Sequence, residues 1–229
     1  KKDNTFDMDA FEKALSKQVK LVSIVYTSNL DGVTFPVKDI IKRAHEEGAL
    51  VLLDSAQAAP HKVVDVKSLD VDFLACSGHK MLGPTGTGML YGKYDLLENL
   101  DPFMVGGETV TNSTYTTATF EEPPHKFEPG LSDYAGLIGL GEALKYLKDK
   151  RTFIEKHEQK LNELMTKELL DIEGLHFIGP NDPSMRGGIA SFYIDGVESH
   201  NLANVLDASH NIMVRSGRHC VHSWFNHHN

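Results

Sequence analysis

A carboxylate and an amine stand at the ends of two apolar segments in the first half of the chain. Asp54 follows the apolar run 49–53, and Lys80 follows the apolar run 71–76, 26 residues beyond Asp54 (54 to 80). A lysine can form a Schiff base with an aldehyde cofactor, and a carboxylate can hold the protonated pyridine nitrogen of pyridoxal phosphate (PLP). A strand-end aspartate and a loop lysine are also common without such a role. The neighbouring residues must therefore show whether this pair could bind PLP.

Polar residues that could hydrogen-bond to PLP surround Asp54 and Lys80. Gln57 lies three residues past Asp54, where it can reach the ring hydroxyl of PLP, and Ser77 and His79 flank Lys80 with donors suited to a phosphate. His79 could instead be a structural histidine at a strand end. Asn29 stands in a Ser-Asn-Leu-Asp-Gly loop, where an asparagine can also serve only the turn.

The segment Arg-Ser-Gly-Arg-His-Cys, residues 215–220, forms a second group of reactive residue types. A thiolate is a nucleophile, and positive neighbours lower the pKa of a thiol, so Arg215, Arg218 and His219 would activate Cys220. Two alternatives are a free surface cysteine and a metal site. We predict no metal, because adjacent ligands such as His219 and Cys220 have poor geometry for one tetrahedral ion, and the other candidate ligands are His222, His227 and His228.

Three stretches, DSAQA, SGHKMLGPTGTG and RSGRHC, together resemble the class V aminotransferase family, most closely its cysteine desulfurases of the SufS/NifS type and their SufS-like branch. The resemblance implies that Lys80 carries PLP and moves protons and that Cys220 takes the sulfur as a persulfide. It also implies that Asn29 and Arg215 lie beside the substrate. The cofactor-binding residues implied are Asp54, Gln57, Ser77, His79, Lys80 and Asn29.

The implied reaction converts L-cysteine to L-alanine and passes the sulfur to an acceptor protein for iron–sulfur cluster assembly, with a homodimer as the enzyme. One alternative is a selenocysteine lyase, which has less need of Cys220. Another is an epimerase or transaminase-like class V enzyme, which would share Asp54 and Lys80 but would not need Cys220. A third is a truncated, inactive homologue.

Composition excludes several other classes. Of the 229 residues, 41% are hydrophobic, and the net charge is 23 − 32 = −9 without a basic run, which disfavours nucleic-acid and anionic-membrane binding. No stretch reaches the roughly 18 apolar residues of a membrane-spanning helix. With only Cys76 and Cys220, we expect no disulfide framework and a cytoplasmic protein; Cys76, inside an apolar run, reads as a core residue.

Strands and helices alternate around these residues. The pattern predicts a helix over 8–16 capped by Asp7, a strand over 19–26 and a helix over 37–47, followed by strands 49–53, 71–76 and 88–91. This order favours a mostly parallel sheet with right-handed crossovers. Because ligands bind at the carboxyl edge of such sheets, Asp54 and Lys80 should share one site.

The rest of the chain predicts two helices, over 133–147 and 152–170, and then a small α+β tail. The tail comprises strands 175–178, 189–194 and 212–214 and a helix capped by Ser199. We expect the α/β fold of PLP-dependent aminotransferases of fold type I, with 1–147 as part of the PLP-binding large domain and 148–229 as part of the small C-terminal domain. The chain starts without methionine, so we expect both domains to be incomplete parts of a longer protein.

Overall fold

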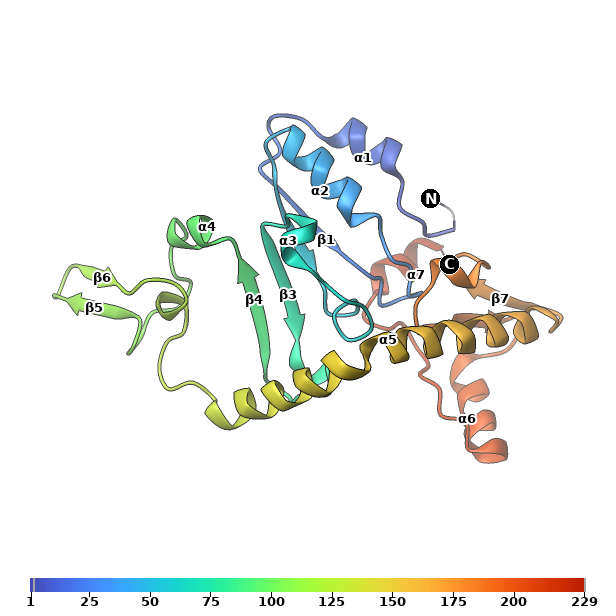
Figure 1. Cartoon of the computed structure of the whole chain (residues 1–229). Coiled ribbons are helices and arrows are strands. Elements are labelled where there is room, and N and C mark those ends of the chain that lie inside the picture. Colours follow the sequence, from blue (N-terminus) through green and yellow to red (C-terminus); the bar gives the residue numbers. More distant parts are fainter. Residues whose placement is uncertain (2, 229) are drawn as a thin grey trace.

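A computed structural model describes residues 1 and 3–228 (Figure 1). Its elements, in chain order, are α1 (Met8–Ala14), β1 (Leu21–Val25), α2 (Val37–Glu46), β2 (Leu50–Asp54), α3 (Val66–Leu69), β3 (Phe73–Ser77), η1 (Gly78–Lys80), β4 (Gly88–Gly92), α4 (Tyr94–Glu98), β5 (Val110–Ser113), β6 (Ala118–Phe120), η2 (His125–Phe127), α5 (Tyr134–Leu170), β7 (Leu175–Ile178), η3 (Pro183–Met185), β8 (Ser191–Ile194), α6 (Ser199–His210) and α7 (His222–His228).

The central sheet has the strand order β1-β2-β3-β4. The first three strands are parallel, and β4 runs antiparallel to β3. The prediction of a mostly parallel sheet is therefore confirmed. In this register Val25 pairs with Asp54, and Asp54 pairs with Ala75, so β1, β2 and β3 end side by side.

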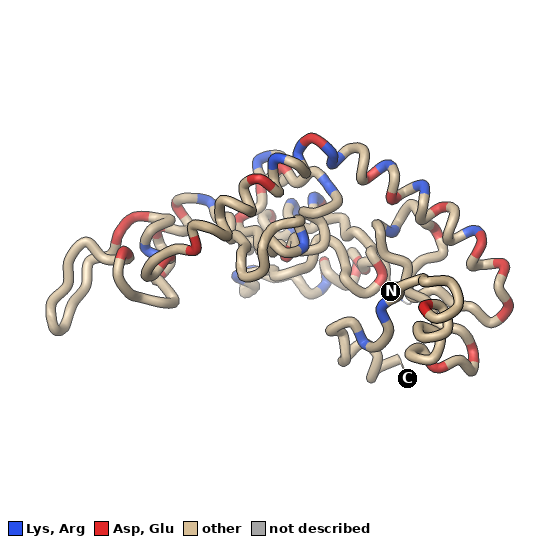
Figure 2. The backbone as a smooth tube through the Cα atoms, turned by 90° about the horizontal axis from the view of Figure 1, so that it is seen from below, with Lys and Arg blue, Asp and Glu red and all other residues tan. Residues whose placement is uncertain are grey.

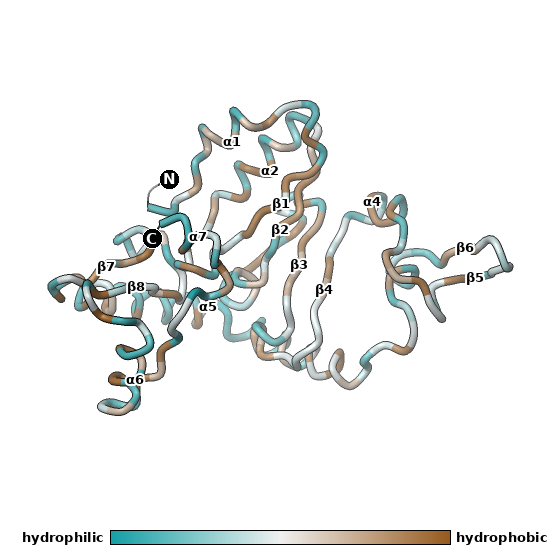
Figure 3. The backbone as a smooth tube through the Cα atoms, turned by 180° about the vertical axis from the view of Figure 1, so that it is seen from behind, coloured by the Kyte–Doolittle hydropathy of each residue, from teal (hydrophilic) through white to brown (hydrophobic). Residues whose placement is uncertain are grey.

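Helix α2 packs against the sheet because its apolar residues recur with helical spacing. Val37, Ile40, Ile41 and Ala44 are buried. Most of them join Val51, Leu53, Val71 and Leu74 in one apolar cluster. Fully burying a side chain of this size contributes about 1.5–3 kcal/mol, so this cluster is the main source of stability for the sheet. Figure 3 shows the strands of the sheet as a mainly apolar part of the backbone.

Helix α5 is one continuous helix of 37 residues, so the prediction of two helices with a break after residue 147 is wrong. The segment 148–151 is Lys-Asp-Lys-Arg, which contains neither glycine nor proline, and nothing in it interrupts the hydrogen bonding. Asp133 caps the helix, since its side chain accepts a hydrogen bond from the Gly136 N–H (2.9 Å). Figure 1 shows α5 running beneath the sheet toward β7. The domain boundary near Lys148 falls inside α5 and stays a prediction.

The tail after α5 differs from the prediction in two places. Glu198, and not Ser199, caps α6, because its carboxylate accepts a hydrogen bond from the Asn201 N–H (2.9 Å). Residues 212–214 form no strand: all three side chains are exposed, and no described strand lies beside them to complete a ladder. Strands β7 and β8 pair as an antiparallel hairpin.

The hairpin β5–β6 and helix α5 differ in their charge. The hairpin β5–β6 projects away from the sheet and carries no charged residue, whereas both signs of charge alternate along α5 (Figures 1 and 2). Among residues 1 and 3–228, no helix combines the length and the apolar composition that crossing a membrane requires.

Candidate active site

The carboxyl edge of the sheet brings the predicted site residues of three strands together. Backbone hydrogen bonds continue past the strand ends, from Tyr26 N to Asp54 O and from Ser55 N to Ala75 O, both 2.8 Å. The loop with Asn29 follows β1, Asp54 is the last residue of β2, and η1 with Lys80 follows β3. The prediction that Asp54 and Lys80 lie at one sheet edge is thus confirmed.

Asp54 is exposed and fixed by its own turn. Its Oδ1 accepts a hydrogen bond from the Ala56 N–H (2.9 Å), which leaves Oδ2 free of hydrogen bonds to the described residues. The amides of Ala58 and Ala59 both donate to the Ser55 carbonyl. This helical turn carries the half-buried Gln57 beside Asp54.

The lysine loop is packed so tightly that residue 78 must be glycine. The Gly78 N–H donates to the Thr87 carbonyl (2.8 Å), and a Cβ added to Gly78 would lie 2.1 Å from Thr87 Oγ1. Thr87 Oγ1 is itself held by the Pro84 carbonyl (2.7 Å). The backbone of η1 is therefore fixed against β4, while the side chains of His79 and Lys80 are exposed. Lys80 forms no ion pair with any residue the structure describes.

Cys220 stands in a tight turn. The Val221 N–H donates to the Arg218 carbonyl (2.8 Å), and both central residues, His219 (φ 46°) and Cys220 (φ 65°), are in the left-handed region. That conformation costs a residue other than glycine about 1–2 kcal/mol. The side-chain amide of Asn29 donates to the His219 carbonyl (2.8 Å), which joins this turn to the sheet edge. Cys220 itself is exposed.

The charges around Cys220 differ from the prediction in one respect. Burial, and then the positive charge of Arg215, lower the pKa of His219 below its ordinary value, so this imidazole is protonated less readily than an ordinary histidine and is a weaker source of positive charge than expected. The Arg218 guanidinium donates to Asn226 Oδ1, toward α7, and Arg215 is exposed.

The residues of the sheet edge fit PLP by their chemistry. The edge offers a carboxylate on Asp54 for a pyridinium nitrogen, an amide on Gln57 for a ring oxygen and an unpaired primary amine on Lys80 for an aldehyde. Ser77 is the last residue of β3 and the exposed His79 follows it, so both stand at this edge with groups that can donate to a phosphate. These residues would hold the cofactor.

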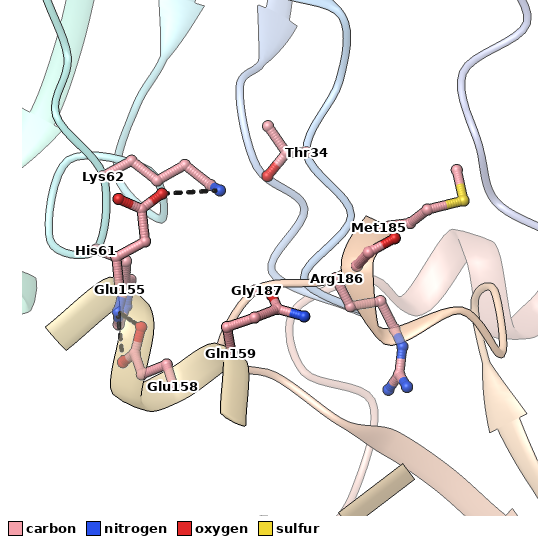
Figure 4. Close-up of a pocket in the computed structure, with 10 residues that line it drawn as sticks. Thr34, His61, Lys62, Glu155, Glu158, Gln159, Met185, Arg186 and Gly187 are labelled. Carbon is pink, nitrogen blue, oxygen red and sulfur yellow. Dashed lines mark hydrogen bonds and ion pairs between the residues drawn. The ribbon is translucent and has the colours of Figure 1, made fainter. Parts of the chain in front are cut away.

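A separate cavity of about 200 Å³ lies between α5, the turn after β2 and η3 (Figure 4). It contains none of the predicted site residues. His61 Nδ1 lies 2.8 Å from the Glu158 carboxylate at this cavity, and Lys62 lies 3.9 Å from that of Glu155. Within the described ranges, no cluster of three or more His, Cys, Asp or Glu side chains is placed to hold a metal ion.

Sequence reasoning missed several residues that shape the site. His200 holds Ser216 at the start of the cysteine segment, with 2.7 Å between Nδ1 and Oγ, and Thr87 supports the lysine loop. His61 ties the turn after β2 to α5. Thr87 lies within the quoted stretch SGHKMLGPTGTG, but its contact with Gly78 is not visible in the sequence, and no local pattern marks His61 or His200, because each acts on a segment distant in the sequence.

Comparisons with known proteins identify the family of this chain. The family model described as "Aminotransferase class-V" matches residues 1–229. A probable cysteine desulfurase of Halalkalibacterium halodurans is 44% identical over 221 residues, which are 96% of this chain and 53% of the relative. A cysteine desulfurase of Haloferax volcanii is 38% identical over 220 residues, 96% of this chain and 51% of the relative. The chain thus spans about half the length of the curated relatives it matches.

Solved structures show the same fold. The apo cysteine desulfurase of Thermococcus onnurineus NA1 matches with a TM-score of 0.91 and 34% identity, over 98% of this chain and 56% of that one. The cysteine desulfurase CsdA of Escherichia coli matches with a TM-score of 0.86 and 32% identity, over 93% of this chain and 52% of that one. The chain belongs to the class-V aminotransferase family and has the fold type I architecture of its PLP-dependent enzymes.

Proposed function

We propose that this member of the class-V aminotransferase family is the part of a PLP-dependent cysteine desulfurase that carries both the cofactor lysine and the nucleophilic cysteine. One observation carries the proposal: the Cys220 turn is hydrogen-bonded, through Asn29, to the sheet edge on which Asp54 and Lys80 lie. A PLP enzyme without a thiol nucleophile would not need a cysteine there. The relatives named cysteine desulfurase support the same reading.

The residues of the sheet edge would divide the work on L-cysteine. PLP, when bound, supplies an electron sink for negative charge that develops at the substrate α-carbon. Lys80 would hold the cofactor and move the proton at that carbon, and the Asp54 carboxylate would keep the pyridine nitrogen protonated. Ser77 and His79 would bind the phosphate, and Gln57 the ring oxygen.

Sulfur transfer would use Cys220. Its thiolate attacks the sulfur of the substrate, and a sulfur–sulfur bond forms as the substrate carbon–sulfur bond breaks. The electron pair of the broken bond stays with carbon, which takes up a proton to become the methyl group of L-alanine. Cys220 then carries the sulfur as a persulfide. Arg215 and Asn29 would lie beside the substrate carboxylate.

The proposed desulfurase would also need a protein that accepts its sulfur. The persulfide sulfur would pass to an acceptor protein for iron–sulfur cluster assembly, in the cytoplasm and from a homodimer. The exposure of Cys220 supports such a transfer, because an acceptor thiol must reach the outer sulfur.

The first test is cofactor attachment. The purified chain is mixed with PLP, reduced with borohydride and digested, and the modified peptide is located by mass spectrometry. We expect the adduct on Lys80, its loss in Lys80→Ala, and full labelling in Lys145→Ala, whose exposed amine forms an ion pair with Glu142. Labelling that is equal in both variants would contradict the cofactor assignment.

The second test is sulfur transfer. With L-cysteine, we expect alanine formation and a persulfide on Cys220, and we expect both to be lost in Cys220→Ala. Full alanine formation by Cys220→Ala would contradict the desulfurase assignment and indicate another class V reaction.

A further inference from the structure

We propose that Asn29 is a positioning residue that holds the Cys220 turn against the carboxyl edge of the sheet, in addition to any contact with cofactor or substrate. The inference rests on the proposed function only in regarding Cys220 as the nucleophile. Its structural part, that one side-chain amide holds the turn, stands on this chain alone.

The turn leaves one carbonyl for an outside donor. Its own hydrogen bond uses the Arg218 carbonyl and the Val221 N–H. The His219 carbonyl belongs to the central peptide and finds no donor within the turn, and the Asn29 amide supplies one at 2.8 Å. Because His219 and Cys220 both occupy the left-handed region, an outside contact is needed to keep this conformation populated.

Asn29 also provides the link that joins the turn to the sheet. Among the described residues, the other side-chain hydrogen bonds of segment 215–221 are made with His200 on α6 and Asn226 on α7, both in the C-terminal part. The Asn29 contact spans 190 positions of sequence. Figure 1 shows the chain before α7 passing beside the loop that follows β1. Without Asn29, the hydrogen bonds of the described side chains would hold the turn to α6 and α7 but not to the edge that carries Asp54 and Lys80.

The side-chain amide of Asn29 can hold the Cys220 turn and donate a hydrogen bond to a substrate at the same time. An asparagine amide has two N–H donors and one carbonyl acceptor, and the His219 carbonyl uses one donor. The second N–H remains for a carboxylate of an amino-acid substrate. One side chain would then set the distance between the bound substrate and the Cys220 thiol.

The test is hydrogen exchange of the apo chain, followed by mass spectrometry on peptides that cover 218–221 and, as a reference, β2. The variants are Asn29→Ala and the isosteric Asn29→Asp, which replaces the N–H donor by a carboxylate oxygen. We expect both to accelerate exchange of the turn by about tenfold, as loss of one partly buried hydrogen bond predicts, and to leave β2 unchanged. Asn29→Gln, which keeps the amide, should recover part of the protection.

The matched control is Asn99→Ala. Asn99 makes the same type of bond, from its side-chain amide to the Asp95 carbonyl (2.7 Å), but far from the cysteine turn in sequence. We expect wild-type exchange at 218–221 in this variant. Wild-type exchange of the turn in Asn29→Asp would overturn the proposal, because a residue that only fills space tolerates an isostere. Equal acceleration of the turn and of β2 would also overturn it. No PLP is added, so failure here is distinct from failure of the cofactor assignment.

Discussion

Lys93 Nζ lies 2.9 Å from Oδ1 of the buried Asp72 carboxylate, and this pair joins the end of β4 to the start of β3. Asp72 Oδ2 lies 2.7 Å from His45 Nε2 and accepts the Val51 N–H at 2.8 Å. The network lies at the amino edge of the parallel strands, opposite the candidate active site. It stabilises the edge of the sheet that holds none of the predicted site residues.

The first prediction is a loss of stability in acid through Asp72. Burial by itself would raise the pKa of Asp72, but hydrogen bonds from Lys93, His45 and the Val51 amide outweigh it and hold the pKa below its usual value. The stability from this lowered pKa is complete above the ordinary value of about 3.9 and is lost as the pH falls below it. Urea unfolding between pH 7 and pH 3 measures the effect.

Two alanine variants separate the contribution of the buried Asp72 to stability from that of an exposed neighbouring carboxylate. Asp72→Ala should lower the free energy of unfolding at pH 7 by about 2–3 kcal/mol, because it leaves the Val51 N–H buried without a partner. Asp70→Ala, at a neighbouring carboxylate that is largely exposed, should cost at most about 1 kcal/mol. Equal costs would contradict the role of burial. A pH slope that survives unchanged in Asp72→Ala would contradict its titration.

Asp54→Asn should remove activity without unfolding the protein. An asparagine side-chain oxygen can still accept the Ala56 N–H, so the turn is kept, but the charge that would hold the pyridine nitrogen protonated is lost. We expect a decrease in kcat of about 10²–10³, on the scale of other lost electrostatic contacts, with unchanged Tm. Asp65→Asn at the cap of α3 is the control and should keep full activity. Full activity in Asp54→Asn would refute the assigned role.

Gly78→Ala should displace the lysine loop. The added Cβ would meet Thr87 Oγ1 at 2.1 Å and the Thr87 carbonyl oxygen at 3.0 Å, and that side chain is itself hydrogen-bonded. We expect a destabilisation of about 1–3 kcal/mol and weaker labelling of Lys80 by PLP and borohydride. Gly107→Ala, where nothing lies within 4 Å, is the comparison. If both variants label like wild type, the tight packing does not position Lys80.

His61 and Glu158 should be energetically coupled. Their contact of 2.8 Å ties the turn that carries Gln57 to α5, and both side chains are partly buried. A double-mutant cycle with His61→Ala and Glu158→Ala, measured by urea unfolding at pH 6, should give a coupling of about 0.5–1 kcal/mol. The cycle for the exposed pair Lys145 and Glu142 should give less. Zero coupling at His61 would mean that the contact does not hold the turn.

The two cysteines should differ sharply in reactivity. Burial raises the pKa of the Cys76 thiol, which reduces its thiolate fraction and its access to reagents, whereas Cys220 is exposed. Iodoacetamide at pH 7.5 should therefore alkylate Cys220 at least about tenfold faster, as read from peptide masses. Comparable rates would show that the Cys76 strand opens readily, which the packing of β3 does not predict.

The sequence alone was sufficient for the sheet and for the residues along its carboxyl edge. Apolar runs that stop at Asp54 and Ser77 define buried strands, and the order of strands and helices makes those strands parallel. Residues that immediately follow parallel strands must share one edge. These are local signals, and they place Asp54 and Lys80 at that edge.

Only the tertiary structure determined the features that depend on residues distant in the sequence. Residues 212–214 are apolar and include two β-branched side chains, but a strand needs a neighbour for its hydrogen bonds, and no described strand is placed beside them. The charge of His219 depends on burial, which its neighbours in sequence do not report. The contact from Asn29 to the cysteine turn forms only when segments 190 positions apart meet, because hydrogen bonds and desolvation are set by proximity in space.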